Sequence, residues 1–368
     1  MNSSYDEISN FLLSFRDNNW EIQIFPHVRV DGDCLGSAAA LATALLMLRI
    51  KAKIYLAEEI PPNLLFMELS ANLFTVCKEP GEKYCAVQGA VVAVDCSADN
   101  RMGKAGSIFS AAAEKIIIDH HLIGERVDVV SEDNMNFHAQ TGETSRSRIP
   151  LCLQMIVPDA SSTAELMYHL LRNMEEKTKV QLITEKTANY LMIGIQSDTG
   201  RFSHHNTTPS ALRTAAALME AGANVYENSV SLFNNIAISA LEMNTKLLAD
   251  AEYYGNGQIA VAVVPRKILD QYLADESAVD GLADSLRNVK GVLISIVLRE
   301  TKSNSLRVNI RTNTPVSAAE FAAYFGGGGH KNAAGFAVSN MDIKTLRAAL
   351  IDYAKKQLKS IDSCSCLS

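Results

Sequence analysis

The chain has 368 residues and a formal net charge of −7; 48% of its residues are hydrophobic and 20% are charged. A chain of this length exceeds one typical core, so two domains are expected, and the acidic balance argues against a general binder of long duplex nucleic acid. No apolar run in the sequence reaches the roughly 18 residues that a membrane helix needs.

Apolar runs alternate with helical segments in the first part of the chain. A helix is expected at 36–50, and strands are expected at 20–25, 52–57, 90–95 and 115–121. Strands that alternate with helices form parallel sheets, and fully apolar strands suit burial on both faces. The pattern therefore predicts a parallel sheet flanked by helices.

Residues 132–158 include the polar run TGETSRSR and predict a long surface loop. Residues 159–174 predict a helix with Ser161 or Ser162 as N-cap and with Glu165 placed for a capping box. Two more helices are expected, at 187–196 and 209–222.

The pattern changes beyond residue 225. Strands at 258–265, 291–300 and 305–312 predict a second, mixed sheet, and a helix is expected at 316–325. The expected organisation is an α/β catalytic domain at 1–225, a helical linker at 226–256, a smaller C-terminal α/β domain at 257–360 and a tail at 361–368.

The seven cysteines are scattered and form no CxxC pair. A disulfide framework is therefore not expected, and a reducing cytoplasm fits this usage best. The first residues, MNSSYDEISNFLLSF, lack a basic n-region and a cleavable apolar core, so no signal peptide is expected.

Acidic and histidine side chains gather where the predicted strands end. They are His27, Asp31, Asp33, Asp95, Asp119, His120, His121 and Asp198. Because ligands of open α/β sheets bind at the carboxyl ends of the strands, these distant segments can converge. Carboxylates that lie so near one another repel unless a cation neutralises their charge. The mixed ligands suit Mn²⁺, Fe²⁺, Co²⁺ or Zn²⁺ better than Ca²⁺, and their number suggests two ions.

Each of these segments also has a simpler interpretation. DGD is typical of a turn, and DHH of a solvated corner. Asp95 could cap a helix, and Asp198 could belong to a turn that ends one. The presence of four acid-bearing segments, each after an apolar run, favours a metal centre over four unrelated turns.

Four glycines at 326–329 precede His330. Glycines let backbone N–H groups approach an anion closely, whereas a flexible hinge, the alternative, needs no histidine. Arg311 is the preferred arginine for holding a phosphate in bidentate fashion, and Arg307, on the same strand face, is also a candidate. The substrate-binding residues expected from this part of the chain are Arg311, Gly327, Gly328, Gly329 and His330.

These motifs resemble those of the DHH phosphoesterase superfamily. The resemblance rests on HVRVDGDCLGS, VDCSADNR, IDHH and IQSDTGRF, and DASSTAEL and FGGGGHKNAAGF resemble the branch with a DHH-associated C-terminal domain. That branch includes bifunctional oligoribonuclease and pAp phosphatase enzymes (nanoRNases) and phosphodiesterases of linear or cyclic dinucleotides. The resemblance covers about residues 20–340, and the longer segment after IDHH departs from it.

The resemblance implies a site for two divalent ions, usually manganese, in a cleft between the domains. One ion would be held by His27, Asp31 and Asp95, and the other by Asp33, Asp95, His120 and Asp198. Asp95 would bridge the ions, Asp119 would support an imidazole, and His121 would face the substrate phosphate or orient the site. The residues expected to carry out the chemistry are Asp95, His120 and His121.

The expected function is a cytoplasmic, manganese-dependent phosphodiesterase for very short single-stranded RNA, with pAp as a further candidate substrate and a metal-bridging hydroxide as nucleophile. A phosphodiesterase of cyclic di-AMP or pApA is the alternative within enzymes. A catalytically idle nucleotide sensor is the alternative from another class, although no expected ligand is missing. The GGGGH signature argues against the pyrophosphatase branch. Related proteins are often dimers, so a homodimer is also considered, although no interface signature is present.

Overall fold

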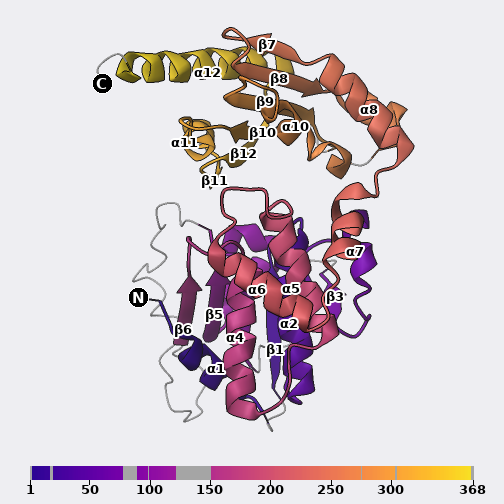
Figure 1. Cartoon of the computed structure of the whole chain (residues 1–368), viewed down its shortest axis with the longest axis vertical. Helices are drawn as coiled ribbons and strands as arrows, with labels where there is room; N and C mark the ends of the chain where they lie inside the picture. The colour runs from indigo at the N-terminus through magenta and orange to yellow at the C-terminus, as the bar shows by residue number, and fades with distance from the viewer. Residues whose placement is uncertain are drawn as a thin grey trace, which may run out of the picture. The chain divides into compact units, whose positions relative to one another are not determined.

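The chain, analysed as a computed structural model, divides into two compact units, Met1–Asn235 and Ile236–Ser368 (Figure 1). The structure describes residues 2–16, 20–77, 89–97, 99–121, 151–274, 276–302 and 305–365. Within these ranges, no helix combines the length and the apolar character needed to cross a lipid bilayer.

The first unit is built on a parallel sheet of six strands in the order β3-β2-β1-β4-β5-β6. The strands are β1 (Glu21–Pro26), β2 (Lys51–Leu56), β3 (Phe74–Val76), β4 (Val91–Val94), β5 (Glu114–Asp119) and β6 (Leu151–Ile156). The strand order reverses between the neighbours β1 and β4. The carboxyl ends of two strands at such a reversal are where open α/β sheets bind ligands.

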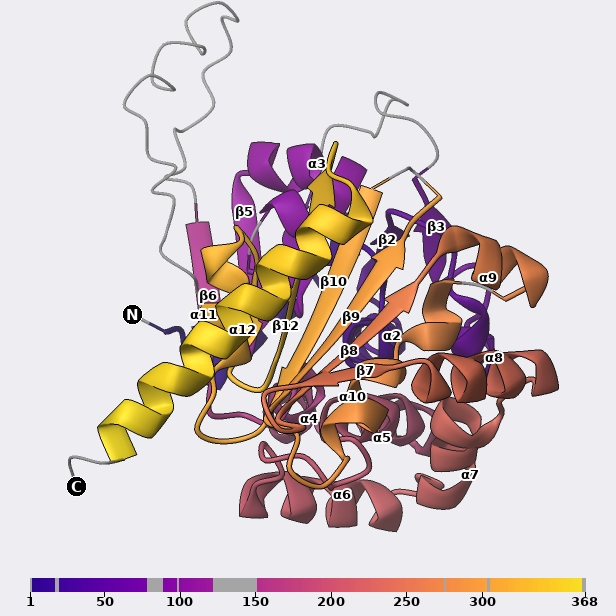
Figure 2. The same cartoon turned by 90° about the horizontal axis from the view of Figure 1, so that it is seen from above.

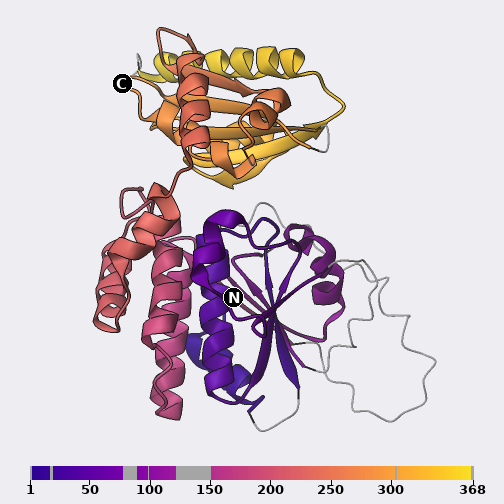
Figure 3. The same ribbon diagram turned by 90° about the vertical axis from the view of Figure 1, so that its right-hand side faces the viewer.

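Helices cover both faces of this sheet (Figure 3). Along β4, Val92 and Val94 pack into one apolar core, and Val91 and Ala93 pack into the other. Burial on both faces explains why the strand is apolar throughout, and the predicted helix-flanked parallel sheet is confirmed. The helices of the unit are α1 (Tyr5–Leu13), α2 (Gly32–Met47), η1 (Pro62–Met67), η2 (Asp99–Ala105), α3 (Gly106–Ala111), α4 (Thr163–Thr178), α5 (Glu185–Asp198), α6 (Pro209–Glu220), α7 (Val225–Ser229) and η4 (Val230–Asn234).

Two local predictions for this unit need correction. Helix α2 begins at Gly32, inside the DGD sequence, because the Asp31 side chain caps it and accepts the N–H of Cys34 at 3.0 Å. The predicted loop at 132–158 is wrong for its last part, since β6 extends the parallel sheet beside β5. The N-terminal segment covers the free edge of β6 through a bond from the Ser3 N–H to Gln154 O at 2.6 Å. Residues 132–150 lie outside the described residues.

The second unit contains the predicted mixed sheet, in the order β11-β12-β10-β9-β8-β7. Strands β8 and β9 are parallel, and the other pairs are antiparallel. The strands are β7 (Glu252–Tyr254), β8 (Ile259–Val264), β9 (Ile294–Glu300), β10 (Ser305–Thr312), β11 (Gly328–His330) and β12 (Ala333–Ser339). Part of the glycine run is therefore a short strand that pairs with β12.

Helices also pack on both faces of the second sheet. The helices are α8 (Ile238–Ala249), α9 (Arg266–Gln271), η5 (Glu276–Val279), α10 (Leu282–Arg287), α11 (Ala318–Tyr324) and α12 (Ile343–Ser365). Helix α12 lies across the strands and packs with α11 on one face, while α8, α9 and α10 pack on the other (Figure 2). Because α12 continues to Ser365, most of the expected tail is helical.

Candidate active site

His27 follows β1 and faces two carboxylates. Its Nδ1 donates to the carbonyl oxygen of Val28 at 2.7 Å, which directs Nε2 toward the acids. Nε2 lies 3.7 Å from Asp31 Oδ2 and 3.3 Å from Asp95 Oδ2. The three residues that the resemblance assigns to one ion therefore lie together.

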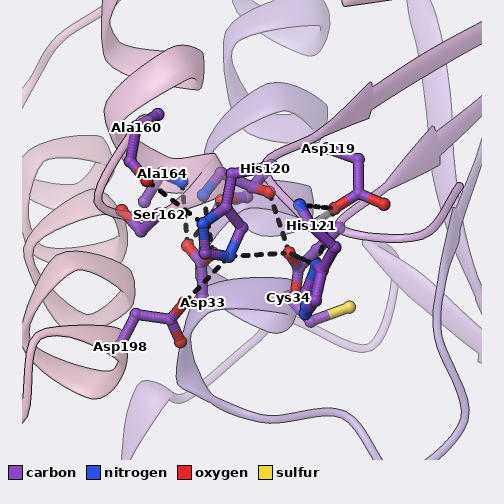
Figure 4. Close-up of polar contacts among 12 residues, drawn as sticks. Asp33, Cys34, Asp119, His120, His121, Ala160, Ser162, Ala164 and Asp198 are labelled. Carbon is purple, nitrogen blue, oxygen red and sulfur yellow. Dashed lines mark hydrogen bonds and ion pairs between the residues drawn. The ribbon is translucent and has the colours of Figure 1, made fainter. Parts of the chain in front are cut away.

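His120 follows β5 and faces three carboxylates (Figure 4). Its Nε2 lies 2.9 Å from Asp198 Oδ2, 3.6 Å from Asp95 Oδ1 and 3.8 Å from Asp33 Oδ2. The ring is held from its other side, where Nδ1 lies 3.3 Å from the carbonyl oxygen of Ala160. The four residues that the resemblance assigns to the second ion are thus also brought together.

Asp95 stands between the two groups. It follows β4, the strand beside β1, and its carboxylate is almost fully buried. One carboxylate oxygen faces His27 and the other faces His120. Its backbone has a φ of 58°, a left-handed conformation that is uncommon outside glycine, asparagine and aspartate. The two oxygens of Asp95 thus face two separate histidines.

Asp33 lies in the first turn of α2 and is buried against the start of α4. Its two oxygens accept the N–H groups of Thr163 at 2.7 Å and Ala164 at 2.8 Å. Gly194 of α5 makes room for this carboxylate, because a Cβ there would lie 2.8 Å from Asp33 Oδ1 and 2.5 Å from the Cβ of Ala164. Helices α2, α4 and α5 therefore pack closely enough to bring Asp33 and Asp198 to one site.

His121 is oriented by Asp119. The Asp119 Oδ1 atom accepts both the backbone N–H of His121, at 3.0 Å, and its Nδ1–H, at 2.7 Å. The His121 side chain is 21% exposed, whereas Asp119 is fully buried. Asp119 thus acts on the neighbouring imidazole, and His121 presents its other ring nitrogen away from this bond.

The carboxylates have strongly different proton affinities. Burial, followed by the charges of Asp95 and Asp198, raises the pKa of Asp33 well above its ordinary range, despite its two N–H donors. Burial also acts to raise the pKa of Asp95, but hydrogen bonds from His121 and His27 outweigh it and hold that pKa well below the ordinary range. The cluster cannot ionise fully without added positive charge.

The imidazoles hold protons firmly in the absence of a metal ion. Burial works against the charged ring of His120, but the carboxylate of Asp198, with Asp33 and Asp95, raises its pKa to about 10. Burial similarly opposes the charge on His121, but Asp119 and Asp95 raise its pKa to about 9. Protons thus supply positive charge that a metal ion would otherwise provide.

The side chains present fit divalent metal ions. Among the described residues, potential ligand atoms lie within 4.8 Å of one another in three overlapping groups: Asp33, His120 and Asp198; Asp95, His120 and His121; and His27, Cys34 and Asp95. Buried carboxylate oxygens and imidazole nitrogens are the ligands that Mn²⁺, Fe²⁺, Co²⁺ and Zn²⁺ accept. Both the distances and the types of ligand atom therefore fit a site for divalent metal ions.

The sequence analysis missed the turn that supports these side chains. Ser162 caps α4, and the acid of Glu165 accepts the N–H and the hydroxyl of the preceding Ser161. The next residue, Thr163, donates its hydroxyl to Asp95 Oδ1 at 2.8 Å. DASSTAEL predicted only a helix start, because contacts to residues far earlier in the chain have no local sequence signal.

The residues predicted to bind substrate in the second unit lie on its sheet. The Nε atom of Arg311 donates to both oxygens of Asp284, at 3.2 and 3.1 Å. Gly327 and Gly329 let this segment lie close against β12. A Cβ at Gly327 would lie 2.4 Å from Gly335 O, and a Cβ at Gly329 would lie 2.6 Å from Ala333 O. Gly328 has open space where a Cβ would be, and His330 ends β11.

Comparison with known families matches both units. Residues 21–195 match the DHH family, N-terminal domain, and residues 256–359 match the DHHA1 domain. These matches confirm the resemblance to DHH phosphoesterases with a DHH-associated C-terminal domain that the sequence motifs indicated.

Curated relatives extend this similarity over nearly the whole chain. The protein named bifunctional oligoribonuclease and PAP phosphatase NrnA from Thermus thermophilus is 26% identical over 339 residues, which are 92% of this chain and 90% of that protein. The protein of the same name from Bacillus subtilis is 26% identical over 86% of this chain and 88% of its own.

A solved structure shares the fold. It is an exopolyphosphatase-related protein from Bacteroides fragilis, which superposes with a TM-score of 0.79 at 20% identity and covers 97% of this chain and 96% of its own. At that identity, the likeness establishes the arrangement of elements alone.

Proposed function

Because the chain belongs to the DHH family and carries a DHHA1 domain, we propose that it is a metal-dependent phosphoester hydrolase that degrades short oligoribonucleotides and dephosphorylates pAp. The names of the relatives that align over about nine-tenths of both chains support this substrate class. The observation that carries the proposal is the position of Asp95, whose two oxygens face separate histidine and aspartate groups.

Two divalent ions, with manganese as the preferred metal, would be held on either side of Asp95. His27 and Asp31 would complete one ligand set, and the other would be Asp33, His120 and Asp198. When bound, such ions supply Lewis-acid stabilisation of the charge that develops during phosphoryl transfer.

His121 is suited to contact the substrate phosphate. Asp119 fixes its ring through Nδ1 and keeps it protonated, so that the partly exposed ring presents an N–H group at its other nitrogen. A protonated imidazole can donate to a phosphate oxygen or give its proton to a departing oxygen. We assign His121 to this contact and Asp119 to its orientation.

The second unit would contribute phosphate contacts. Asp284 fixes Arg311 through Nε, and the Ile310 carbonyl oxygen accepts from Nη1 at 3.2 Å, so Nη2 is the terminal nitrogen that would be offered to an anion. The backbone at Gly327, Gly328 and Gly329, with His330, would add donors beside it. These contacts would select substrates that carry a terminal phosphate. The homodimer and the cytoplasmic location stay predictions.

A substrate panel tests the proposal. Purified protein with added Mn²⁺ is incubated with a five-nucleotide RNA, pAp, pApA and cyclic di-AMP, and the products are separated by chromatography. We expect the RNA to be shortened to mononucleotides and pAp to yield AMP. If cyclic di-AMP or pApA is turned over faster than both the RNA and pAp, the protein is instead a dinucleotide phosphodiesterase. Binding of all four without hydrolysis would indicate a nucleotide sensor.

A further inference from the structure

The turn at residues 160–164 contacts three of the proposed metal ligands directly and a fourth, Asp198, through Asn206. Its Ala160 carbonyl contacts His120, and its Thr163 and Ala164 N–H groups bind Asp33. The side-chain amide of Asn206 donates to the carbonyl oxygen of Ser161, at 2.8 Å, and to that of Asp198, at 3.2 Å, and so links the turn to Asp198. Figure 4 shows Ala160, Ser162 and Ala164 beside His120 and Asp33. The contact to Asp95 is made by a hydroxyl, that of Thr163.

Thr163 joins two carboxylates from different elements, one in the first turn of α2 and one just after β4. Its backbone N–H lies 2.7 Å from Asp33 Oδ2, and its hydroxyl lies 2.8 Å from Asp95 Oδ1. The residue is fully buried, so water does not compete for either bond. The hydroxyl is the donor in this bond, and the carboxylate oxygen accepts it. One residue at the start of α4 thereby fixes the position of Asp33 relative to Asp95.

We propose that Thr163 is a positioning residue whose hydroxyl orients Asp95 so that both carboxylate oxygens face metal ions at once. The inference rests on the proposed function, because it takes Asp95 as the shared ligand. Hydrogen-bonded groups behind metal ligands typically contribute about 10–100-fold to metal affinity.

The start of helix α4 does not itself require this hydroxyl. Ser162 is the N-cap, and its side chain accepts the N–H of Glu165 at 3.2 Å. Thr163 occupies the first helical position, and its hydroxyl makes its bond to Asp95 instead. The role in the site is therefore separable from helix capping.

The test compares matched variants by calorimetric titration with Mn²⁺. Thr163→Val keeps the branched shape and the N–H to Asp33 but removes the hydroxyl, whereas Thr163→Ser keeps the hydroxyl. Thr187→Val is the matched control. Thr187 is also a buried threonine in the first turn of a helix, α5, but its hydroxyl donates to the backbone oxygen of Leu182, at 2.7 Å. Circular dichroism checks the fold of each variant, and Thr163→Ala replaces Thr163→Val if that variant does not fold.

We expect Thr163→Val to weaken Mn²⁺ binding by about 10–100-fold and to lower kcat on pAp more than it raises KM. Thr163→Ser should stay within about threefold of the parent in Mn²⁺ affinity, and Thr187→Val should lower the melting temperature alone. Parent-like Mn²⁺ affinity in Thr163→Val, or an equal loss in Thr163→Ser, would overturn the role of the hydroxyl and leave the metal site standing. Absence of Mn²⁺ binding by the parent would overturn both proposals.

Discussion

The Nε2 atom of His27 lies 3.3 Å from Oδ2 of Asp95, and this contact joins the ends of the neighbouring strands β1 and β4. Residues at the ends of these two strands meet because the strand order reverses between them. The pair is therefore a consequence of the sheet topology, and the other acidic and histidine side chains of the site lie around it.

Replacing Asp95 by asparagine should abolish most of the activity while leaving the fold intact. Asparagine keeps the shape and tolerates the left-handed backbone at this position better than alanine, but it lacks the charge that would bridge two cations. We expect kcat/KM for pAp to fall on the order of 10³-fold, about 4 kcal/mol of transition-state stabilisation, with weaker Mn²⁺ binding. Steady-state kinetics and calorimetry measure the two effects.

The matched control is Asp250→Asn, which alters a surface carboxylate paired with Lys246 at 2.8 Å. It should leave both measurements near those of the parent, since surface ion pairs contribute little. An Asp95→Asn protein with near-normal turnover would remove the bridging role.

Gly194→Ala should lower both stability and metal affinity. The added Cβ would meet the Asp33 carboxylate at 2.8 Å and the Ala164 Cβ at 2.5 Å, so α2, α4 or α5 must shift. Overpacking of this kind costs about 1–3 kcal/mol of unfolding free energy. Urea unfolding of the metal-free protein and titration with Mn²⁺ give the two values.

Gly281→Ala serves as the comparison for this change. Gly281 has a φ of −79°, and no other atom lies within 4 Å of the position that its Cβ would take, so alanine fits there without strain. Its unfolding free energy should stay within about 0.5 kcal/mol of the parent value. Equal stabilities of the two alanine variants would show that α2 and α5 tolerate a wider separation.

The sequence predicted the strands and the residues at their ends because both depend on local patterns. Val91–Val94 is apolar throughout since both of its faces are buried, and Asp95 follows at once. The grouping of ligands came from the resemblance and stays a prediction, while the structure places Asp95 3.3 Å from His27 and 3.6 Å from His120.

The support of those ligands could not be predicted from local patterns. The bonds from Thr163 to Asp33 and Asp95 span 130 and 68 positions in sequence. Edge strand β6 was missed for a related reason, because a short strand beside a polar run is defined by its pairing with β5. Likewise, the partner of Arg311 is an acid on α10, a helix that the sequence did not single out.

Metal binding at neutral pH should release protons. His120, whose pKa is raised to about 10, is protonated at pH 7 in the metal-free protein, and Asp33 also has a raised pKa. A bound cation needs a neutral imidazole and an ionised carboxylate, so it displaces these protons. Mn²⁺ affinity should therefore rise as the pH increases from about 6 toward about 9.

Calorimetric titrations at about pH 7 in buffers of different ionisation enthalpy count the released protons. We expect about one or more per protein molecule. An observed enthalpy that does not depend on the buffer would contradict the protonated state of the metal-free cluster.

Arg311→Lys should weaken substrate binding with a smaller effect on turnover. Asp284 holds the Arg311 Nε at 3.1 and 3.2 Å from its two oxygens, and Nη1 donates to Ile310 O, so the plane of the guanidinium is fixed. Lysine keeps the charge but loses this planar fork. Because a hydrogen bond to a charged group is worth about 1.5–3 kcal/mol, KM for pAp should rise by about tenfold or more.

Arg347→Lys, on α12 and paired with Glu252, is the matched change in the same unit and should leave KM unaltered. If both variants raise KM equally, loss of arginine destabilises the unit in general, and Arg311 has no specific part in phosphate recognition.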